Sequence, residues 1–95
     1  MRGDVCVIVN PASGRGRGAQ ALPKIREAFA AVGVSDIRIT AVQHDEATFA
    51  RHAIADGRTT LVAVGGDGTI SNVANAIIGS GSDARLAMIA AGTGN

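Results

Sequence analysis

The chain has 95 residues and a formal net charge of +1, which fits one small domain or part of one and argues against a general binder of polyanions. Aromatic residues make up 2% of it, too few for a surface that stacks nucleic-acid bases, so we expect no nucleic-acid partner. The single cysteine, Cys6, supports neither a disulfide framework nor a cysteine-based metal site. No apolar run reaches membrane-spanning length, and we expect a cytoplasmic location, with peripheral contact to a membrane left open.

Apolar residues alternate between two patterns along the chain. Three segments carry them at helical spacing and predict helices, the last of which covers residues 69–78. Short apolar runs before, between and after these segments predict strands. The expected strands are residues 5–9, 37–41, 60–64 and 86–90.

The first two helices have recognisable ends. Residues 10–18 are a loop by composition. Proline is tolerated best in a first helical turn, so Pro23 predicts that the first helix begins near Leu22, and Gly33 is a plausible stop. The second helix should run from Asp45, a candidate N-cap, to residue 55.

Strands that alternate with helices predict the α/β class, as a three-layer, doubly wound, parallel sheet with helices on both faces. Glycine-rich loops follow the first, third and fourth strands but not the second. Ligands of such sheets bind beyond the carboxyl ends of the strands, where the strand order reverses. If the first and third strands flank that point their loops converge, which favours the order 2-1-3-4 over 3-2-1-4. We expect residues 1–95 to form one nucleotide-binding domain, the N-terminal part of a longer protein.

The most informative run is Gly-Gly-Asp-Gly-Thr at residues 65–69, directly between an expected strand and an expected helix. Its glycines predict positive φ angles or a close approach of the backbone to a ligand. The N–H groups that begin the following helix favour an anion, and Asp67 could provide an oxygen ligand to Mg²⁺ on a nucleotide phosphate. A hairpin turn is the alternative, but Ile70, Val73 and Ile77 follow helical rather than strand spacing.

Two familiar phosphate motifs do not fit. A P-loop needs a lysine in its glycine-rich turn, and the one lysine, Lys24, falls on the first helix. Gly14, Gly16 and Gly18 match the Rossmann fingerprint poorly, and the second strand ends without the acidic residue that would hold a ribose. Both classes of nucleotide site are therefore disfavoured.

The remaining polar candidates are weaker. Arg15 and Arg17 could contact phosphates or simply be solvated loop charges, and the sequence leaves both open. His44 and His52 lack carboxylates or cysteines at ligand spacing, so we expect exposed positions rather than a metal site.

Three motifs together resemble the catalytic domain of the diacylglycerol kinase family, which includes sphingosine kinases, ceramide kinases and bacterial lipid kinases. They are Asn-Pro-x-Ser-Gly at residues 10–14, the run at residues 65–69, and Gly-Thr-Gly-Asn at residues 92–95. The middle motif is shared with phosphofructokinases and NAD kinases, and the other two favour lipid kinases. One departure is visible, because the family usually has glutamate where this chain has Asn72, which puts that carboxylate's supporting hydrogen bonds and full activity in question.

The resemblance implies ATP and Mg²⁺ as cofactors and a second, β-rich domain, absent from this segment, that helps to form a lipid site. We expect the backbone N–H groups of residues 65–69 to hold phosphate oxygens, with Thr69 and Thr93 as hydroxyl donors. Asp67 is the expected catalytic residue, either as a ligand of Mg²⁺, direct or through water, or as an aid to deprotonation of the lipid hydroxyl; both roles stay open. The expected nucleotide-binding residues are Asn10, Pro11, Ala12, Ser13, Gly14, Thr40, Gly65, Gly66, Asp67, Gly68, Thr69, Ile70, Ser71 and Thr93.

The function expected from these residues is transfer of the γ-phosphoryl group of ATP to a lipid hydroxyl, such as that of diacylglycerol, in phospholipid biosynthesis. A kinase resembling NAD kinase or phosphofructokinase, or a non-catalytic nucleotide-binding module, is the alternative. We expect the lipid to bind through the second domain, and no phosphoryl transfer from this segment alone. A homodimer is left open.

Overall fold

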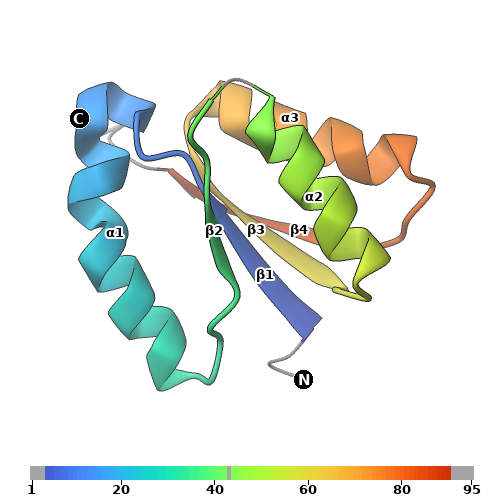
Figure 1. Cartoon of the computed structure of the whole chain (residues 1–95), viewed down its shortest axis with the longest axis horizontal. Helices are drawn as coiled ribbons and strands as arrows, with labels where there is room; N and C mark the ends of the chain where they lie inside the picture. Colours follow the sequence, from blue (N-terminus) through green and yellow to red (C-terminus); the bar gives the residue numbers. More distant parts are fainter. Residues whose placement is uncertain (1–3, 43, 91–95) are drawn as a thin grey trace.

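The computed structural model describes residues 4–42 and 44–90. Strands and helices alternate through them as the sequence predicts (Figure 1). The elements are β1 (Val5–Val9), α1 (Ser13–Ala31), β2 (Ile37–Ile39), α2 (Asp45–Ala55), β3 (Thr60–Gly65), α3 (Asp67–Gly79) and β4 (Arg85–Ala90).

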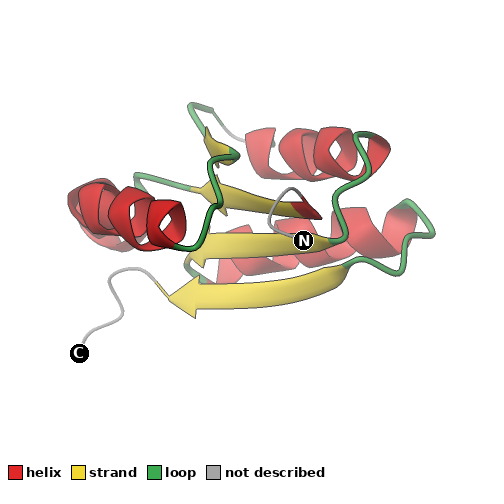
Figure 2. Cartoon of the chain, turned by 90° about the horizontal axis from the view of Figure 1, so that it is seen from below, coloured by secondary structure: helices red, strands yellow, loops and turns green. Residues whose placement is uncertain are grey.

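The four strands form one sheet in the order β2-β1-β3-β4, and every neighbouring pair is parallel. The arrowheads of the strands accordingly point the same way in Figure 2. Both the predicted α/β class and the predicted strand order are confirmed. From β1 the chain crosses to β2 on one side and later returns to β3 on the other, so the carboxyl ends of β1 and β3 flank the point where the order reverses.

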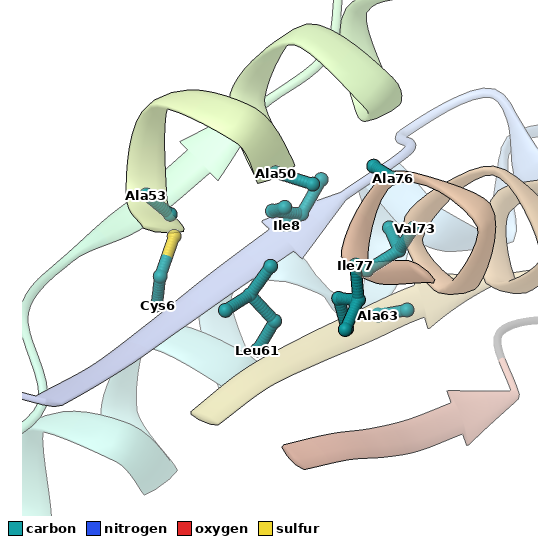
Figure 3. Close-up of a cluster of buried hydrophobic side chains, with 9 residues drawn as sticks. All are labelled: Cys6, Ile8, Ala50, Ala53, Leu61, Ala63, Val73, Ala76 and Ile77. Carbon is teal, nitrogen blue, oxygen red and sulfur yellow. The ribbon is translucent and has the colours of Figure 1, made fainter. Parts of the chain in front are cut away.

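Alternate residues of the central strands face opposite helical layers, because successive side chains of a strand point to opposite faces. One face packs against α1, and the other packs against α2 and α3 (Figures 1 and 3). The buried cluster on the α1 side contains Val7, Val9, Ile25, Val34, Val62 and Val64. The cluster on the other side contains Cys6, Ile8, Ala50, Ala53, Leu61, Ala63, Val73, Ala76 and Ile77. The sheet is therefore a rigid base from which the loops at its carboxyl edge project.

The predicted start of the first helix near Leu22 is wrong. Helix α1 is assigned from Ser13 and carries Pro23 inside it, although residues 14–16 have left-handed backbone angles and the regular turns follow them. Contacts with the preceding loop fix this earlier start. The Ala19 N–H donates to the Pro11 carbonyl at 2.9 Å.

Gly18 shows why the chain turns so tightly at this point. A β-carbon at Gly18 would lie 2.3 Å from the carbonyl oxygen of Asn10, so only glycine lets the helix sit this close to the loop. This contact with the preceding loop outweighs the preference of proline for a first turn. At the other end of α1, Gly33 has the positive φ of 82° expected of a helix stop.

The start of α2 also differs from the prediction. His44 occupies the position before the helix with φ 77°, and Asp45 is the first helical residue rather than the N-cap. The Asp45 carboxylate instead accepts hydrogen bonds from the N–H groups of Ala41 and Val42, at 2.8 and 3.0 Å. Because these amides bond to a side chain and not to a neighbouring strand, β2 ends at Ile39 instead of residue 41.

Candidate functional site

Two adjoining clefts lie at the carboxyl edge of the sheet. The first, of about 310 Å³, is bounded by the segments that follow β1 and β2, and the second, of about 260 Å³, lies between the loop after β1 and the start of α3. Asn10 and Glu46 line both. The other lining residues are Pro11, Ala12, Thr40, Ala41 and Val42 in the first cleft, and Ser13, Gly14, Gly66, Gly68, Thr69 and Asn72 in the second.

Asn10 connects the loop after β1 to the rest of the site. Its backbone N–H donates to the Val64 carbonyl at 3.0 Å, which places it beside the end of β3. Its side-chain Oδ1 accepts the N–H of Ala12 at 2.9 Å and so shapes the loop. Its Nδ2 donates to Glu46 Oε2 at 3.2 Å and to Thr69 Oγ1 at 3.3 Å. One amide therefore joins three elements.

Glu46 is a buried carboxylate, with 6% of its surface exposed. It accepts hydrogen bonds from Thr69 Oγ1 at 2.7 Å and from Asn72 Nδ2 at 2.9 Å, in addition to the bond from Asn10. No lysine or arginine pairs with it within the part of the chain that the structure describes. Three side-chain donors thus compensate the desolvation of this charge in place of a cation.

Glu46 is not among the site residues predicted from the sequence. A signal was present, because Glu46 shares a helical face with the apolar residues Phe49, Ala50 and Ala53, and an acidic residue in phase with a buried face needs partners. The residues that satisfy it are distant in the chain, so spacing alone could not have identified them.

Thr69 is 3% exposed, and its hydroxyl makes two side-chain hydrogen bonds. The oxygen donates its proton to Glu46 and accepts from the Asn10 amide. In the structure this hydroxyl donates its one proton to the Glu46 carboxylate, so the expected donation to a phosphate would require that bond to be given up. The oxygen keeps one lone pair beyond these two bonds, and the backbone N–H of Thr69 is a further group that could contact a ligand.

The glycines of the run at residues 65–69 serve close approach, not positive φ. A β-carbon on Gly65 would lie 2.5 Å from Thr69 Oγ1 and 2.8 Å from Ser13 Oγ. Gly66 and Gly68 have open space where a β-carbon would stand, and both line the second cleft. None of the three has a positive φ, so that part of the prediction is wrong. Gly65 lets Thr69 and Ser13 approach the backbone at the end of β3, whereas Gly66 and Gly68 leave space in the second cleft.

The first turn of α3 presents unpaired backbone donors to this region. The Ile70 N–H donates to the Gly66 carbonyl at 3.1 Å, and it makes the first hydrogen bond of the helix. The N–H groups of residues 67–69 come before it and have no intrahelical partner. Together with the partial positive charge of a helix N-terminus they form an arrangement that suits an anion.

Asp67 is the first residue of α3 and is exposed. Its carboxylate has no hydrogen-bond or ion-pair partner among residues 4–42 and 44–90. Four of the predicted site residues are not among the residues that line either cleft: Gly65, Asp67, Ile70 and Ser71. Ile70 packs against the apolar cluster beneath α2 and α3, and Ser71 is exposed. The predicted Thr93 lies outside the described residues.

Thr40, one of the expected nucleotide-binding residues, lines the first cleft and has 6% of its surface exposed. Its N–H donates to the Val9 carbonyl at 2.9 Å, which places it beside the end of β1. The neighbouring Ala41 and Val42 amides hold the pKa of the Asp45 carboxyl below its usual range, through the hydrogen bonds described above. The wall of this cleft is thereby tied to the start of α2.

The described part of the chain contains no cluster of three or more histidine, cysteine or acidic side chains that could hold a metal ion unaided. His44 and His52 are exposed, as expected. Within the same residues no helix combines the length and the apolar character needed to cross a membrane.

Comparison with known proteins gives a consistent result. The family model of the diacylglycerol kinase catalytic domain matches residues 4–95. A probable YegS-like lipid kinase of Xanthomonas campestris pv. campestris is 42% identical over 64 residues, which are 63% of this chain and 21% of that protein. A diacylglycerol kinase of Mycobacterium tuberculosis is 33% identical over 97 residues, covering 98% of this chain and 30% of that protein.

Solved structures agree with the sequence matches. A putative diacylglycerol kinase from Bacillus anthracis superposes with a TM-score of 0.73 at 33% identity, over 96% of this chain and 33% of that one. A second B. anthracis diacylglycerol kinase structure gives a TM-score of 0.71 at 32% identity, over 94% of this chain. The chain thus spans between a fifth and a third of the length of these relatives.

Proposed function

Because the chain belongs to the family of the diacylglycerol kinase catalytic domain, we propose that it binds Mg-ATP and contributes to transfer of the γ-phosphoryl group to a lipid hydroxyl. The observation that carries this proposal is the start of α3. There the N–H groups of residues 67–69 have no intrahelical partner, and the exposed Asp67 stands in the chain between Gly66 and Gly68, which line a cleft of about 260 Å³. Phosphoryl transfer is catalysed mainly by positioning and charge neutralisation. The N–H groups would position the phosphates, and Asp67 would hold the cation that neutralises their charge.

The two adjoining clefts would hold different parts of the nucleotide. The phosphates fit the second cleft, because Gly66 and Gly68 leave space beside the unpaired N–H groups. The nucleoside fits the adjoining cleft of about 310 Å³, where Pro11 and Val42 give apolar contacts and Thr40 is a polar neighbour. Asn10 stands between the two.

Asp67 fits a role towards Mg²⁺. In nucleotide sites this ion is held by one or two carboxylates together with phosphate oxygens and water, so a single exposed carboxylate beside a phosphate cleft is sufficient. When bound, the ion would neutralise the charge that develops on the phosphate oxygens. The same carboxylate could instead accept the proton of the lipid hydroxyl, and the test below separates these roles.

Diacylglycerol is the acceptor that we propose first. Its support is that the M. tuberculosis relative and the B. anthracis structures carry the name diacylglycerol kinase. Ceramide and sphingoid bases are the other lipid acceptors to be compared, and NAD and fructose 6-phosphate represent the soluble alternatives.

The test is transfer of radiolabel from ATP to these acceptors by the complete natural protein and its Asp67→Asn variant. We expect label in diacylglycerol and a loss of at least about 100-fold in kcat for the variant, because a charged group acting in the transition state is removed. If Asp67 holds Mg²⁺, the variant also needs more Mg²⁺ for half-maximal rate; if it acts as a base, that requirement is unchanged.

The control is Asp83→Asn, which removes another exposed carboxylate, just before β4 at the opposite edge of the sheet. It should leave the rate unchanged. Normal activity of Asp67→Asn would refute the role of this residue, and no transfer to any lipid by the unaltered protein would refute the proposed function.

A further inference from the structure

We infer that Glu46 is a positioning residue of the nucleotide site, an inference that rests on the proposed function. Glu46 would not itself need to touch ATP. Its carboxylate holds the Asn10 amide and the Thr69 hydroxyl in one arrangement, and so fixes the loop after β1 against the first turn of α3.

The contacts of Glu46 reach separate parts of the site. One partner, Asn10, shapes the loop after β1 through its bond from the Ala12 N–H. The other two, Thr69 and Asn72, stand on successive turns of α3, where the unpaired N–H groups begin. A single side chain on α2 therefore sets the spacing between the two walls of the second cleft.

The negative charge of Glu46 helps to distinguish a positioning role from a purely structural one. A carboxylate that lines a phosphate cleft repels the phosphates, so electrostatics alone would favour a neutral residue at this position. A carboxylate is, however, the side chain that offers acceptors on both of its ends and no donor. All three side-chain bonds to Glu46 arrive from donors, which is the pattern that a carboxylate satisfies and a glutamine satisfies only in part.

The repulsion and the positioning predict opposite effects when the charge is removed. If Glu46 only fills space or stabilises the fold, neutral replacements leave the affinity of folded protein for Mg-ATP unchanged or raise it. If Glu46 positions the site, they lower that affinity, and the loss grows as acceptors are removed. Glutamine keeps one acceptor, whereas leucine is similar in size and keeps none.

The experiment is calorimetric titration of the complete natural protein with Mg-ATP, with circular dichroism to establish the folded fraction of each variant. We expect Glu46→Gln to raise Kd about threefold and Glu46→Leu about tenfold or more, the order expected when hydrogen bonds to a charged group are weakened and then lost. In steady-state kinetics the effect should fall mainly on the KM for ATP. Glu27→Leu, at an exposed position of α1, is the control and should leave Kd unchanged.

A second pair of variants keeps the test decisive if Glu46→Leu does not fold. Thr69→Val removes the donor to Glu46, whereas Thr69→Ser keeps it, so the valine variant should bind Mg-ATP more weakly than the serine variant. The effects of Glu46→Gln and Thr69→Val should be less than additive, because both weaken the same bond.

Each outcome bears on a different statement. Unchanged or tighter binding by folded Glu46→Gln or Glu46→Leu, or equal binding by Thr69→Val and Thr69→Ser, would overturn the positioning role while the proposed function stands. Absence of Mg-ATP binding by the unaltered protein would overturn the proposed function and this inference with it.

Discussion

Substitution of Gly65 by alanine should destabilise the protein far more than the same substitution at Gly66. The two glycines are neighbours, and neither has a positive φ, so backbone strain does not distinguish them. The space around them does. A β-carbon on Gly65 would lie 2.5 Å from Thr69 Oγ1 and 2.6 Å from Thr69 Cβ, whereas one on Gly66 would meet nothing within 4 Å.

The magnitude follows from what Thr69 would have to give up. Overpacking of a tight site costs typically about 1–3 kcal/mol. Thr69 cannot move aside without lengthening its 2.7 Å bond to Glu46, and a hydrogen bond to a charged group contributes about 1.5–3 kcal/mol. Small shifts of the atoms around Thr69 would relieve part of the overpacking at the expense of the hydrogen bond, so the two costs do not add in full. We therefore expect Gly65→Ala to lower the free energy of unfolding by about 2–4 kcal/mol. Gly66→Ala should change it by less than about 0.5 kcal/mol.

Urea unfolding of the complete natural protein, followed by circular dichroism, measures the difference. With a slope of about 1–1.5 kcal/mol per molar urea, the Gly65→Ala midpoint should fall by roughly 2 M in the transition that includes this domain. Equal midpoints for the two variants would refute the reasoning, because they would mean that Thr69 is not held where the structure has it. A large loss for Gly66→Ala would refute it equally, since nothing stands near that position.

Three further predictions concern other parts of the chain. Gly66→Val should keep the fold but raise the Kd for Mg-ATP about tenfold or more in calorimetric titration, because its side chain would enter the phosphate cleft. Burial, helped by the nearby charge of Asp36, raises the pKa of the Cys6 thiol to about 12, so iodoacetamide at neutral pH should label Cys6 only after unfolding. Hydrogen bonds from Arg38 and then Arg58 hold the pKa of Asp36 below its usual range, so its stabilising contribution is present above the unfolded value of about 3.9 and is lost as the pH falls through the lower folded value. Unfolding midpoints measured from about pH 5 to about pH 3 should therefore fall more steeply for the unaltered protein than for Asp36→Asn.

The architecture could be predicted because its causes are local in the sequence. The four apolar runs form strands, and in the central ones alternate residues such as Val7 and Ile8 face different helical layers. The strand order followed from a second local feature, the glycine-rich segments after the first and third strands. Both signals can be read in a window of a few residues, and the structure confirms both.

The differences between the expectations and the structure arise from contacts with residues outside the motif concerned. The early start of α1 depends on Gly18 meeting the Asn10 carbonyl, which outweighs the local signal of Pro23. The role of the Thr69 hydroxyl depends on Glu46, a residue on another helix. A motif identifies residues that belong to a site. It does not show which of them bond to one another, because some of their hydrogen-bond partners, such as Glu46, lie outside the motif.

Asn72 illustrates how such neighbours can account for a departure from a family pattern. The resemblance implies glutamate at this position, yet here the Asn72 amide donates to Glu46 at 2.9 Å. A glutamate at position 72 would bring a second carboxylate close to Glu46, where like charges repel, and no lysine or arginine pairs with Glu46 among the described residues. An amide at position 72 is therefore the complement of a carboxylate at position 46, because it supplies a donor where a second acid would supply repulsion. Glu46 on α2 thus brings a carboxylate to the phosphate cleft, which it lines itself, in addition to the carboxylate of Asp67 on α3. There it accepts hydrogen bonds from Thr69 and Asn10.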